Sequence, residues 1–538
     1  MITFLICVAI LVGGYFTYGT IVEKILAPND AIITPAKRLA DGVDYVELSW
    51  PKVLLTQFLN IAGLGPIFGA ILGAMFGPVA FIWITFGCLF VGSVADMLVG
   101  FIAMRHDGLS ITELVGLYLG KHTQKFMLVF TFILLVLVGV TFTMAPAAWL
   151  NNRIIHLGTI TLGNGTIVPW VWVLIVFVYH IVLTIVPIEQ LIAKLFPPLS
   201  IIMLLACIIL LVMTFVNWGN SPYELVGGVF DNGNLASGLQ GHTIRMMEFW
   251  EFPSFTQHPA GLSFFPFIFT TIACGAVSGF HATKSPMMAR CIQLESEAKR
   301  VFFGSMIIEG IVALIWAAIT MAFFGDALFS THANAGGTMV NQVALAGNQG
   351  GVVDTISFSY LPGWLATFLI FTAVVIFPVT SADTGFRAVR LMLADAFKVD
   401  QEKVMGRVLI SIPIFVSAWA LTWVDFQIIW RYFAWSNLSI ASIALWMGGR
   451  YLATRKKCHW IATLPAMLTS MGSVAYILQA PEGFRWAWGG ASFMGIASNI
   501  IGIVVGLAFM GLFLATAGKA PEKLAHLISD AEKEHSAA

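Results

Sequence analysis

Several ionisable side chains lie inside long apolar stretches of this sequence, where an isolated charge is unstable. They include the carboxyls of Asp96, Glu309 and Asp383, together with His281 and Lys284. At membrane depth such groups mark ion pathways, proton relays or substrate contacts. Residues of these types can bind and release a proton, hold a cation or neutralise a carboxylate.

The three carboxyls also have structural interpretations. Asp383 precedes Arg387 by one helical turn, so a salt bridge and the binding of an ion or proton are both open. For Asp96, a coupling role and the capping of a neighbouring broken helix are both open. For Glu309, a satisfied hydrogen bond between helices is favoured over a role as proton carrier.

The basic side chains are weighed in the same way. His281 is the better candidate for a proton switch, because the reference pKa of imidazole lies near neutrality. His180, in another apolar segment, is interpreted as a satisfied packing residue. Lys284 could meet a substrate carboxylate, but the favoured interpretation is that its stem snorkels to the inner membrane face.

Two of the apolar segments are interrupted by glycine and proline. One contains NIAGLGP at residues 60–66, and the other contains ACGAVSGFHATKSP at residues 273–286. Proline removes a backbone donor and glycine weakens a helix, so the freed backbone groups need partners in the protein or a wet cavity. Secondary transporters bind substrate and coupling ion at such paired breaks. The alternative is a pair of kinks that serve helix packing.

The helix ends at these breaks predict the chemistry of the ligands. We expect Pro66 at the first position of one half-helix, and Ser285 as the N-cap of the other with Pro286 in its first turn. The N-terminus of a half-helix favours a carboxylate. Carbonyls left by the preceding half-helices, at 60–62 and 277–279, suit a cation. The predicted substrate is a small anion or carboxylate-bearing molecule, carried together with a cation or proton.

Two sets of candidate site residues follow. For the substrate they are Gly63, Gly65, Gly275, Ser278, Gly279, His281, Lys284 and Ser285. For the coupling ion or proton they are Asn60, Ala62, Asp96 and Asp383. The glycines are included because a ligand can approach their backbone closely.

The composition indicates a polytopic membrane protein. Of 538 residues, 58% are hydrophobic and 10% are charged, whereas a soluble domain is about 25% charged. Zero net charge and the lack of a basic run exclude nucleic acid as a partner. The six cysteines show no C-x-x-C spacing, so no metal site or disulfide framework is indicated. No enzyme motif is present, and no cofactor is expected beyond a coupling proton or Na⁺.

Apolar segments long enough to span a bilayer number thirteen. Their approximate bounds are 1–22, 53–77, 79–103, 126–149, 170–187, 199–217, 263–288, 302–324, 363–385, 407–424, 426–447, 459–479 and 491–516. Alternate loops then hold 24 of the 28 Lys and Arg residues, and the opposite side holds only Arg153, Arg245, Arg431 and Arg485. The positive-inside rule places the N-terminus outside and the C-terminus in the cytoplasm.

This orientation makes the two broken segments run in opposite directions. The predicted fold is an all-α polytopic membrane protein with a five-plus-five inverted repeat. Residues 53–217 form the first repeat and residues 263–447 the second, each opening with a broken helix. The remaining parts are an extra span with a cytoplasmic loop, an external loop, and further spans with a cytoplasmic tail, at 1–52, 218–262 and 448–538.

Four segments resemble the carbon starvation protein A (CstA) family of bacterial inner-membrane transporters. They are FLNIAGLGPIFGAILGAMFG at 58–77, GSVADMLVGFIAMRHDG at 92–108, SGFHA at 278–282 and TSADT at 380–384. The resemblance implies the fold of the amino acid–polyamine–organocation transporters, and uptake of pyruvate with protons, or of peptides. It also implies that the first break and the pair Thr380 and Ser381 form a cation site.

The favoured function is therefore import of a small carboxylate, pyruvate foremost, by symport with a proton or Na⁺. Peptide import on the same scaffold is the alternative; it needs a larger cavity and a partner for the amine, such as Asp96 or Asp383. A nutrient-sensing receptor would need a sizeable output domain, and a channel fits paired breaks poorly. The expected partners are the solute and membrane lipid, in a bacterial inner membrane.

Overall fold

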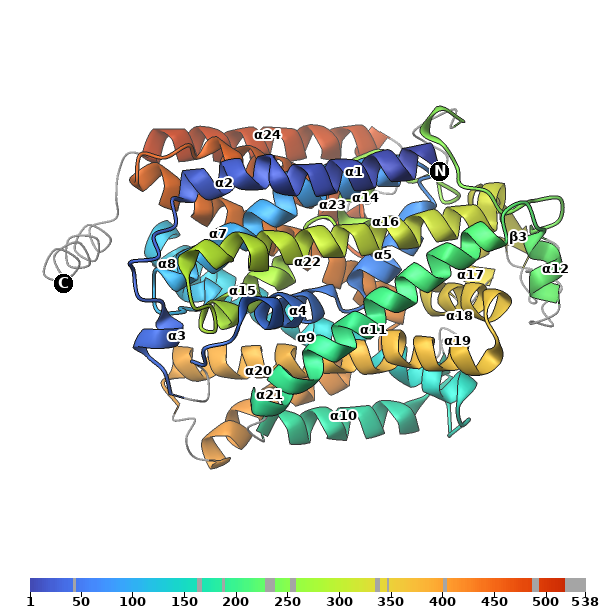
Figure 1. Cartoon of the computed structure of the whole chain (residues 1–538), viewed down its shortest axis with the longest axis horizontal. Coiled ribbons are helices and arrows are strands. Elements are labelled where there is room, and N and C mark those ends of the chain that lie inside the picture. Colours follow the sequence, from blue (N-terminus) through green and yellow to red (C-terminus); the bar gives the residue numbers. More distant parts are fainter. Residues whose placement is uncertain are drawn as a thin grey trace, which may run out of the picture.

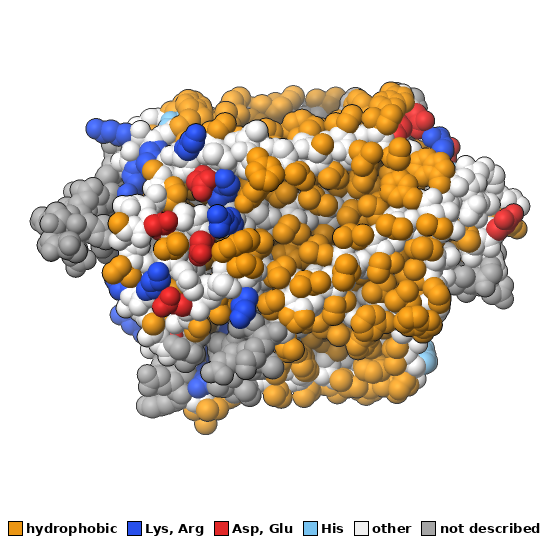
Figure 2. All heavy atoms as spheres, in the orientation of Figure 1, with side chains coloured by type: hydrophobic (Ala, Val, Ile, Leu, Met, Phe, Trp, Pro, Cys, Tyr) orange, Lys and Arg blue, Asp and Glu red, His pale blue; other side chains and the backbone are white. Residues whose placement is uncertain are grey.

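The computed structural model describes the 538-residue chain except residues 42–44, 162–166, 186–188, 228–237, 252–257, 334–338, 346–347, 400–403, 486–492 and 518–538. Its long helices run side by side along the long axis of the molecule (Figure 1). Figure 2 shows apolar side chains in a broad band across one face, with Lys and Arg gathered at one end. This distribution is that of a multi-pass membrane protein with an apolar, lipid-facing belt.

The first part of the chain is a succession of helices joined by short connections, and most of the long ones are apolar on all sides, as membrane-embedded helices are. In order they are α1 (Ile2–Phe16), α2 (Tyr18–Leu26), α3 (Pro35–Arg38), α4 (Trp50–Ala62), α5 (Gly65–Ala74), α6 (Val79–Gly87), the π-helix η1 (Cys88–Gly92), α7 (Ser93–Met104), α8 (Ile111–Leu119), α9 (Lys121–Arg153), α10 (Trp170–Ile185) and α11 (Glu189–Val216).

The second part begins with short elements and returns to long helices. They are α12 (Pro222–Gly227), η2 (Phe249–Glu251), α14 (Phe264–Thr271), α15 (Gly279–Ala289), η3 (Glu295–Glu297), η4 (Lys299–Phe303), α16 (Gly304–Phe324), η5 (Gly325–Phe329), α17 (Gln342–Leu345), α18 (Asn348–Tyr360), α19 (Gly363–Ile370), η6 (Phe371–Ile376), α20 (Phe377–Phe397), α21 (Val404–Leu421), α22 (Phe426–Thr454), α23 (Trp460–Gln479) and α24 (Phe493–Thr516).

Strands, where the structure describes the chain, form two short antiparallel pairs. β1 (Ile160–Thr161) pairs with β2 (Ile167–Val168), and β3 (Thr331–Ala333) pairs with β4 (Met339–Asn341). The second pair lies with α17 and α18 in the connection from α16 to α19. Hydropathy does not predict these elements, because none of them is a long apolar run.

Each of the thirteen predicted segments contains helix. Within the described residues, nine helices are long and apolar enough to cross a membrane, or ten if α4 and α5 form one bent span. The helix α10 is shorter, α14 and α15 are separated by the second break, and α22 is not among the nine. Thirteen spans and the inverted repeat therefore stay predictions.

The first break lies where the sequence predicts it, although Pro66 is the second residue of α5 and not the first. The helix α4 ends at Ala62, and α5 begins at Gly65 with Pro66 in its first turn. Gly63 ends α4 with a φ of +48°, a conformation that only glycine adopts without strain. The two helices are bent by 50° relative to each other. Proline fits there because the first turn of a helix leaves its N–H groups unpaired in any case.

The second break differs from the prediction. The N-cap of α15 is Ser278 rather than Ser285, and Pro286 lies inside the helix instead of in its first turn. The preceding helix α14 already ends at Thr271, so the carbonyls at 277–279 belong to the start of α15 and not to the end of a half-helix. The prediction failed because it used the proline as a boundary, whereas side chains from other helices set the start of α15.

Several predicted boundaries concern loops. The predicted external loop at 218–262 contains α12 and η2 and is described only in part. The cytoplasmic tail lies, from residue 518 onward, outside the described residues. The division into repeats and the sidedness of the loops stay predictions.

Candidate functional site

The two breaks lie against each other among buried residues. A Cβ atom on Gly65 would overlap the side chain of Cys274, and a Cβ atom on Gly275 would stand 3.4 Å from the Cα of Pro66. Glycine at these positions allows the two interrupted segments to touch. In this conformation protein atoms fill the space beside the glycines, and substrate contact there stays a prediction.

Beside the second break, a histidine is held between two carboxylates. The Nδ1 atom of His281 lies 3.3 Å from Asp96 Oδ2, and its Nε2 atom lies 3.1 Å from Glu309 Oε2. All three side chains are at most 1% exposed. The other oxygen of Glu309 accepts the N–H of Gly275 at 3.0 Å, inside the break. The sequence predicted these residues one by one, and the fold joins them into one cluster from α7, α15 and α16.

This geometry assigns roles that the sequence left open. Glu309, not Asp96, makes the contact that caps the broken segment. The favoured hydrogen bond of Glu309 is thus present, but it joins α16 to the non-helical Gly275 and not to a second helix. Both carboxylates face one imidazole away from water, so their charges repel unless a proton lies between them. The cluster can therefore hold and release a proton. Across the described part of the chain, no group of three or more His, Cys, Asp or Glu is arranged to hold a metal ion.

Lys284 is enclosed, one turn beyond His281 on α15. Its side chain is 0% exposed, and its Nζ atom lies 4.9 Å from the centre of the Phe280 ring. None of the described residues makes a hydrogen bond with this ammonium. The favoured prediction that Lys284 snorkels to the membrane face is wrong, because the packing of α15 inside the bundle leaves its side chain no path to the surface. A buried lysine without an anionic partner is unstable in its charged form.

Asp383 belongs to a second ionisable pair. Its Oδ1 atom lies 2.5 Å from Nδ1 of His180, which joins α20 to α10. His180 is thus an ion-pair or hydrogen-bond partner as well as a packing residue. The guanidinium of Arg387, the partner considered from the sequence, donates to the carbonyl of Leu183 at 3.2 Å. The pair keeps ion or proton binding by Asp383 open.

The helix before the first break, α4, contacts α20, which carries the Thr380 and Ser381 pair that the resemblance assigns to a cation site. The hydroxyl of Ser381 donates to the carbonyl of Leu59 at 3.0 Å, near the end of α4. The hydroxyl of Thr380 donates to a carbonyl of its own helix. Asn60 is 1% exposed, and none of the described groups donates to its side-chain oxygen. Ala62 is buried beside it. These residues lie together, and a cation bound there stays a prediction.

Of the four segments that resemble the CstA family, those at 58–77, 92–108 and 278–282 lie within the part of the chain that matches a known family model. Residues 1–216 and 159–361 match the model of the family described as "Carbon starvation protein CstA". This chain belongs to the CstA family. The match covers more than half of the chain.

Individual CstA relatives extend the similarity. The chain is 37% identical to an uncharacterized membrane protein of Haemophilus influenzae over 351 residues, 60% of this chain and 91% of that protein. It is 26% identical to the peptide transporter CstA of Campylobacter jejuni, over 89% of this chain and 80% of that protein. It is 28% identical to the peptide transporter CstA of Bacillus subtilis, over 82% of this chain and 83% of that protein.

A solved structure is also similar to this CstA chain. It is a manganese transporter of Eremococcus coleocola in complex with an aromatic bis-isothiourea compound, with a TM-score of 0.48 and 13% identity. The alignment covers 89% of this chain and 98% of the manganese transporter.

Asn437 is a site residue of this CstA chain that sequence reasoning missed. Its Oδ1 atom accepts the N–H of Phe280 at 2.8 Å and the hydroxyl of Ser278 at 3.3 Å. Gly279 packs directly on the backbone of Asn437, which holds the start of α15 against α22. An asparagine within an apolar span was the available signal, since buried polar groups there are seldom without a partner.

Gln57 was missed in the same way. Its side-chain amide donates to the hydroxyl of Ser285 at 3.1 Å, and Ser285 in turn donates to the carbonyl of His281. Ser285, predicted as a substrate contact and helix cap, therefore links α4 to α15. This bond ties the helix before the first break to the helix after the second.

Proposed function

We propose that this transporter imports a small carboxylate, pyruvate foremost, by symport with a proton. The observation that carries the proposal is the placement of His281 between Asp96 and Glu309 at the second break. A fully buried group that holds a proton beside an interrupted helix is suited to couple proton binding to a change of shape. The relatives named as transporters support the general class.

The coupling step follows from the double role of Glu309. Its carboxylate takes part in the proton cluster and also accepts the N–H of Gly275 in the break. A hydrogen bond to a carboxylate is stronger than one to a neutral carboxyl group. Movement of the proton from His281 to Glu309 therefore weakens the hold of α16 on the break, and loss of that proton from Glu309 restores it. This difference biases the equilibrium between two arrangements of the break.

Lys284 gives the substrate its binding partner in this proposal. The ammonium is buried on the same helix as the proton cluster and one turn away. A carboxylate that reaches it gains a charge-assisted hydrogen bond in a dry environment. Substrate and proton then act on α15 together, which is the requirement for symport.

Peptide import is the second candidate, and the printed names of the relatives favour it. A peptide also carries a carboxylate for Lys284, and its amine needs an acidic partner. Asp383, paired with His180, is one such group outside the proton cluster. The two substrates therefore share one half of the proposed site and differ in the other.

The proposal also includes the number of membrane spans, the inverted repeats and the orientation of the chain in the membrane. Thirteen spans, with residues 53–217 and 263–447 as inverted repeats, would place the two breaks symmetrically, and their direct contact supports this. We place the N-terminus outside and the C-terminus in the cytoplasm of a bacterial inner membrane, because Lys and Arg gather at one end of the molecule (Figure 2).

The test is uptake into proteoliposomes that contain the purified protein. Labelled pyruvate, a dipeptide and a tripeptide are offered with an imposed pH gradient, a sodium gradient or no gradient. We expect concentrative pyruvate uptake with the pH gradient alone. Uptake driven only by sodium overturns proton coupling and points to Asn60 and Ser381; uptake of peptides but not pyruvate replaces the substrate; no uptake by folded protein overturns the proposal.

A matched pair of lysine variants tests the substrate contact. We expect Lys284→Gln to lower the affinity for the carboxylate by about tenfold or more, the worth of a hydrogen bond to a charged group. Lys52→Gln, an exposed lysine at the start of α4, should leave uptake unchanged. Equal KM values in the two variants would contradict the role of Lys284.

A further inference from the structure

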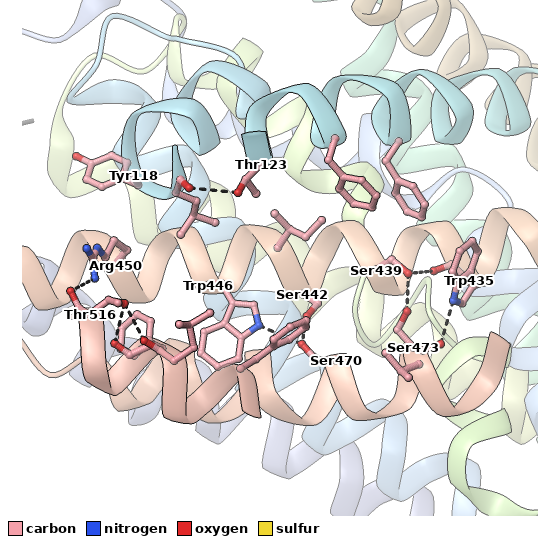
Figure 3. A pocket seen from close by; sticks show the side chains of 18 residues that line it. Tyr118, Thr123, Trp435, Ser439, Ser442, Trp446, Arg450, Ser470, Ser473 and Thr516 are labelled. Atoms are coloured by element: carbon pink, nitrogen blue, oxygen red, sulfur yellow. Dashed lines mark hydrogen bonds between the residues drawn. The ribbon is translucent and has the colours of Figure 1, made fainter. Parts of the chain in front are cut away.

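A groove of about 670 Å³ lies between α8 and α9 on one side and α22, α23 and α24 on the other (Figure 3). Neither the proton cluster nor Lys284 lines it. Its floor includes Trp446 and Phe513, which are buried, whereas Phe126 and Leu512 at its rim are 56% and 64% exposed. The groove therefore opens toward the surroundings of the bundle rather than toward the breaks.

Polar atoms in the walls of the groove are already paired with one another. The hydroxyl groups of Ser442 and Ser470 lie 2.6 Å apart, and the indole N–H of Trp446 donates to Ser470 at 3.0 Å. Ser439 and Ser473 form a second such pair, visible in Figure 3. Because these groups bind each other, the surface offered to a ligand is mainly apolar. Hydrocarbon fits this surface better than a polar solute does.

The two ends of the groove differ in charge. The guanidinium of Arg450 lies at one end, beside Thr516, whose carbonyl it contacts. Three further basic residues, at 455–457, follow directly after α22, although none of them lines the groove. The other end is marked by Trp435, fifteen residues away along α22, so the groove is about 22 Å long at 1.5 Å per residue. This length matches one leaflet with its headgroup, about half of 40–45 Å.

We propose that this groove binds one anionic phospholipid. The phosphate lies at the Arg450 end, and an acyl chain lies along Trp446 and Phe513 between α9 and α24. Basic pockets between membrane helices bind acidic headgroups by this combination of charge and apolar wall. A lipid in this place bridges α9 to α22, the helix whose Asn437 caps the second break. The site is independent of the proposed transport function.

The test is a lipid titration of the delipidated, full-length protein, followed by native mass spectrometry. Dioleoylphosphatidylglycerol is compared with dioleoylphosphatidylcholine, which has the same chains and no net charge. We expect one molecule of the anionic lipid to bind about fivefold more tightly or better, the effect of a basic group near the headgroup. Equal affinities for the two lipids overturn the proposal.

Variants locate the binding in the groove. Ile443→Trp fills the groove and should weaken binding of both lipids about tenfold, because it displaces roughly two methylenes of the chain. Leu464→Trp is the matched control, since Leu464 is 48% exposed on α23 and does not line the groove. Arg450→Gln should remove the preference for the anionic lipid. Unchanged binding by Ile443→Trp places the lipid elsewhere and overturns the proposal.

The C-terminal tail of the chain is the other candidate to occupy the groove, and a truncation tests it directly. The chain continues after Ala517, close to the Arg450 end of the groove. A protein that ends at residue 517 should bind the anionic lipid with the affinity of the full chain. A large gain in affinity after this truncation means that the tail fills the groove, and it overturns the lipid assignment.

Discussion

The break between α4 and α5 leaves two residues outside helix, whereas the break between α14 and α15 leaves seven, residues 272–278. The first is closed mainly by close packing of glycine: a Cβ atom on Gly63 would stand 2.5 Å from the Phe142 ring, and one on Gly65 would overlap Cys274. The second is closed by side chains from distant helices, Glu309 of α16 and Asn437 of α22. One break is closed by shape and the other by polar contacts.

This difference separates two tasks. A break closed by shape resists movement, because packed atoms have few alternative positions. A break closed by an ionisable side chain changes its stability when that side chain gains or loses a proton. The coupling chemistry is therefore expected at the second break, and the first break provides a rigid surface against which it closes.

The largest expected effect comes from removing the proton site. His281→Gln should reduce uptake driven by a pH gradient about a hundredfold or more, the contribution of a positioned acid–base group. Exchange of labelled for unlabelled substrate without a gradient should persist, because Lys284 is untouched. His122→Gln, an exposed histidine on α9, is the control. Normal gradient-driven uptake in His281→Gln would remove the distinction between the breaks.

His106, which lies outside both breaks, also makes the stability of the protein depend on pH. Its contribution has to be subtracted from any pH effect assigned to the breaks. Burial, with the nearby guanidinium groups of Arg455 and Arg105, lowers the pKa of His106 from 6.5 to about 4. As the pH falls, His106 is protonated in the unfolded chain before it is protonated in the folded protein. The contribution of His106 to the free energy of unfolding is therefore complete above pH 6.5, is lost as the pH falls toward 4, and does not change further below pH 4.

His106→Gln should abolish this loss, about 3 kcal/mol of unfolding free energy over that range. The measurement is unfolding in detergent between pH 8 and pH 3.5, wild type against variant. Parallel curves for the two proteins would show that His106 does not titrate there.

The close packing at the first break is tested by adding one methyl group to a glycine. Gly65→Ala should destabilise the protein by about 1–3 kcal/mol, because its Cβ overlaps Cys274 in the second break. Gly13→Ala on α1 is the matched control, since nothing lies within 4 Å of the added atom. The melting temperature in detergent should fall only for Gly65→Ala, and equal values in both variants would mean that the first break is not tightly packed.

Closure by polar contacts predicts a smaller effect. Asn437→Ala removes the acceptor for the N–H of Phe280 and should cost about 1–2 kcal/mol of stability. Amide hydrogen exchange at the start of α15 should increase in the alanine variant. Unchanged exchange there would show that Asn437 does not hold the second break.

The interrupted helices and the kinds of residue at the site could be predicted because both depend on local chemistry. Proline and glycine disrupt a helix wherever they occur in hydrocarbon, and Pro66 lies in the first turn of α5, one position later than predicted. The start of α15 could not be predicted, because its N-cap partner Asn437 is 157 positions away from Phe280 in the sequence. The burial of Lys284 was missed for a similar reason, since snorkelling depends on which neighbours block the path.

By itself, the sequence determined that the chain is a multi-pass membrane protein with two broken segments and a few ionisable groups among apolar ones. These properties follow from the hydrophobic effect and from backbone hydrogen bonding along one stretch of chain. Only the tertiary structure decided that Asp96, His281 and Glu309 meet, that Lys284 is enclosed, and that the two breaks touch. Such contacts depend on how helices pack, and no local pattern records that packing.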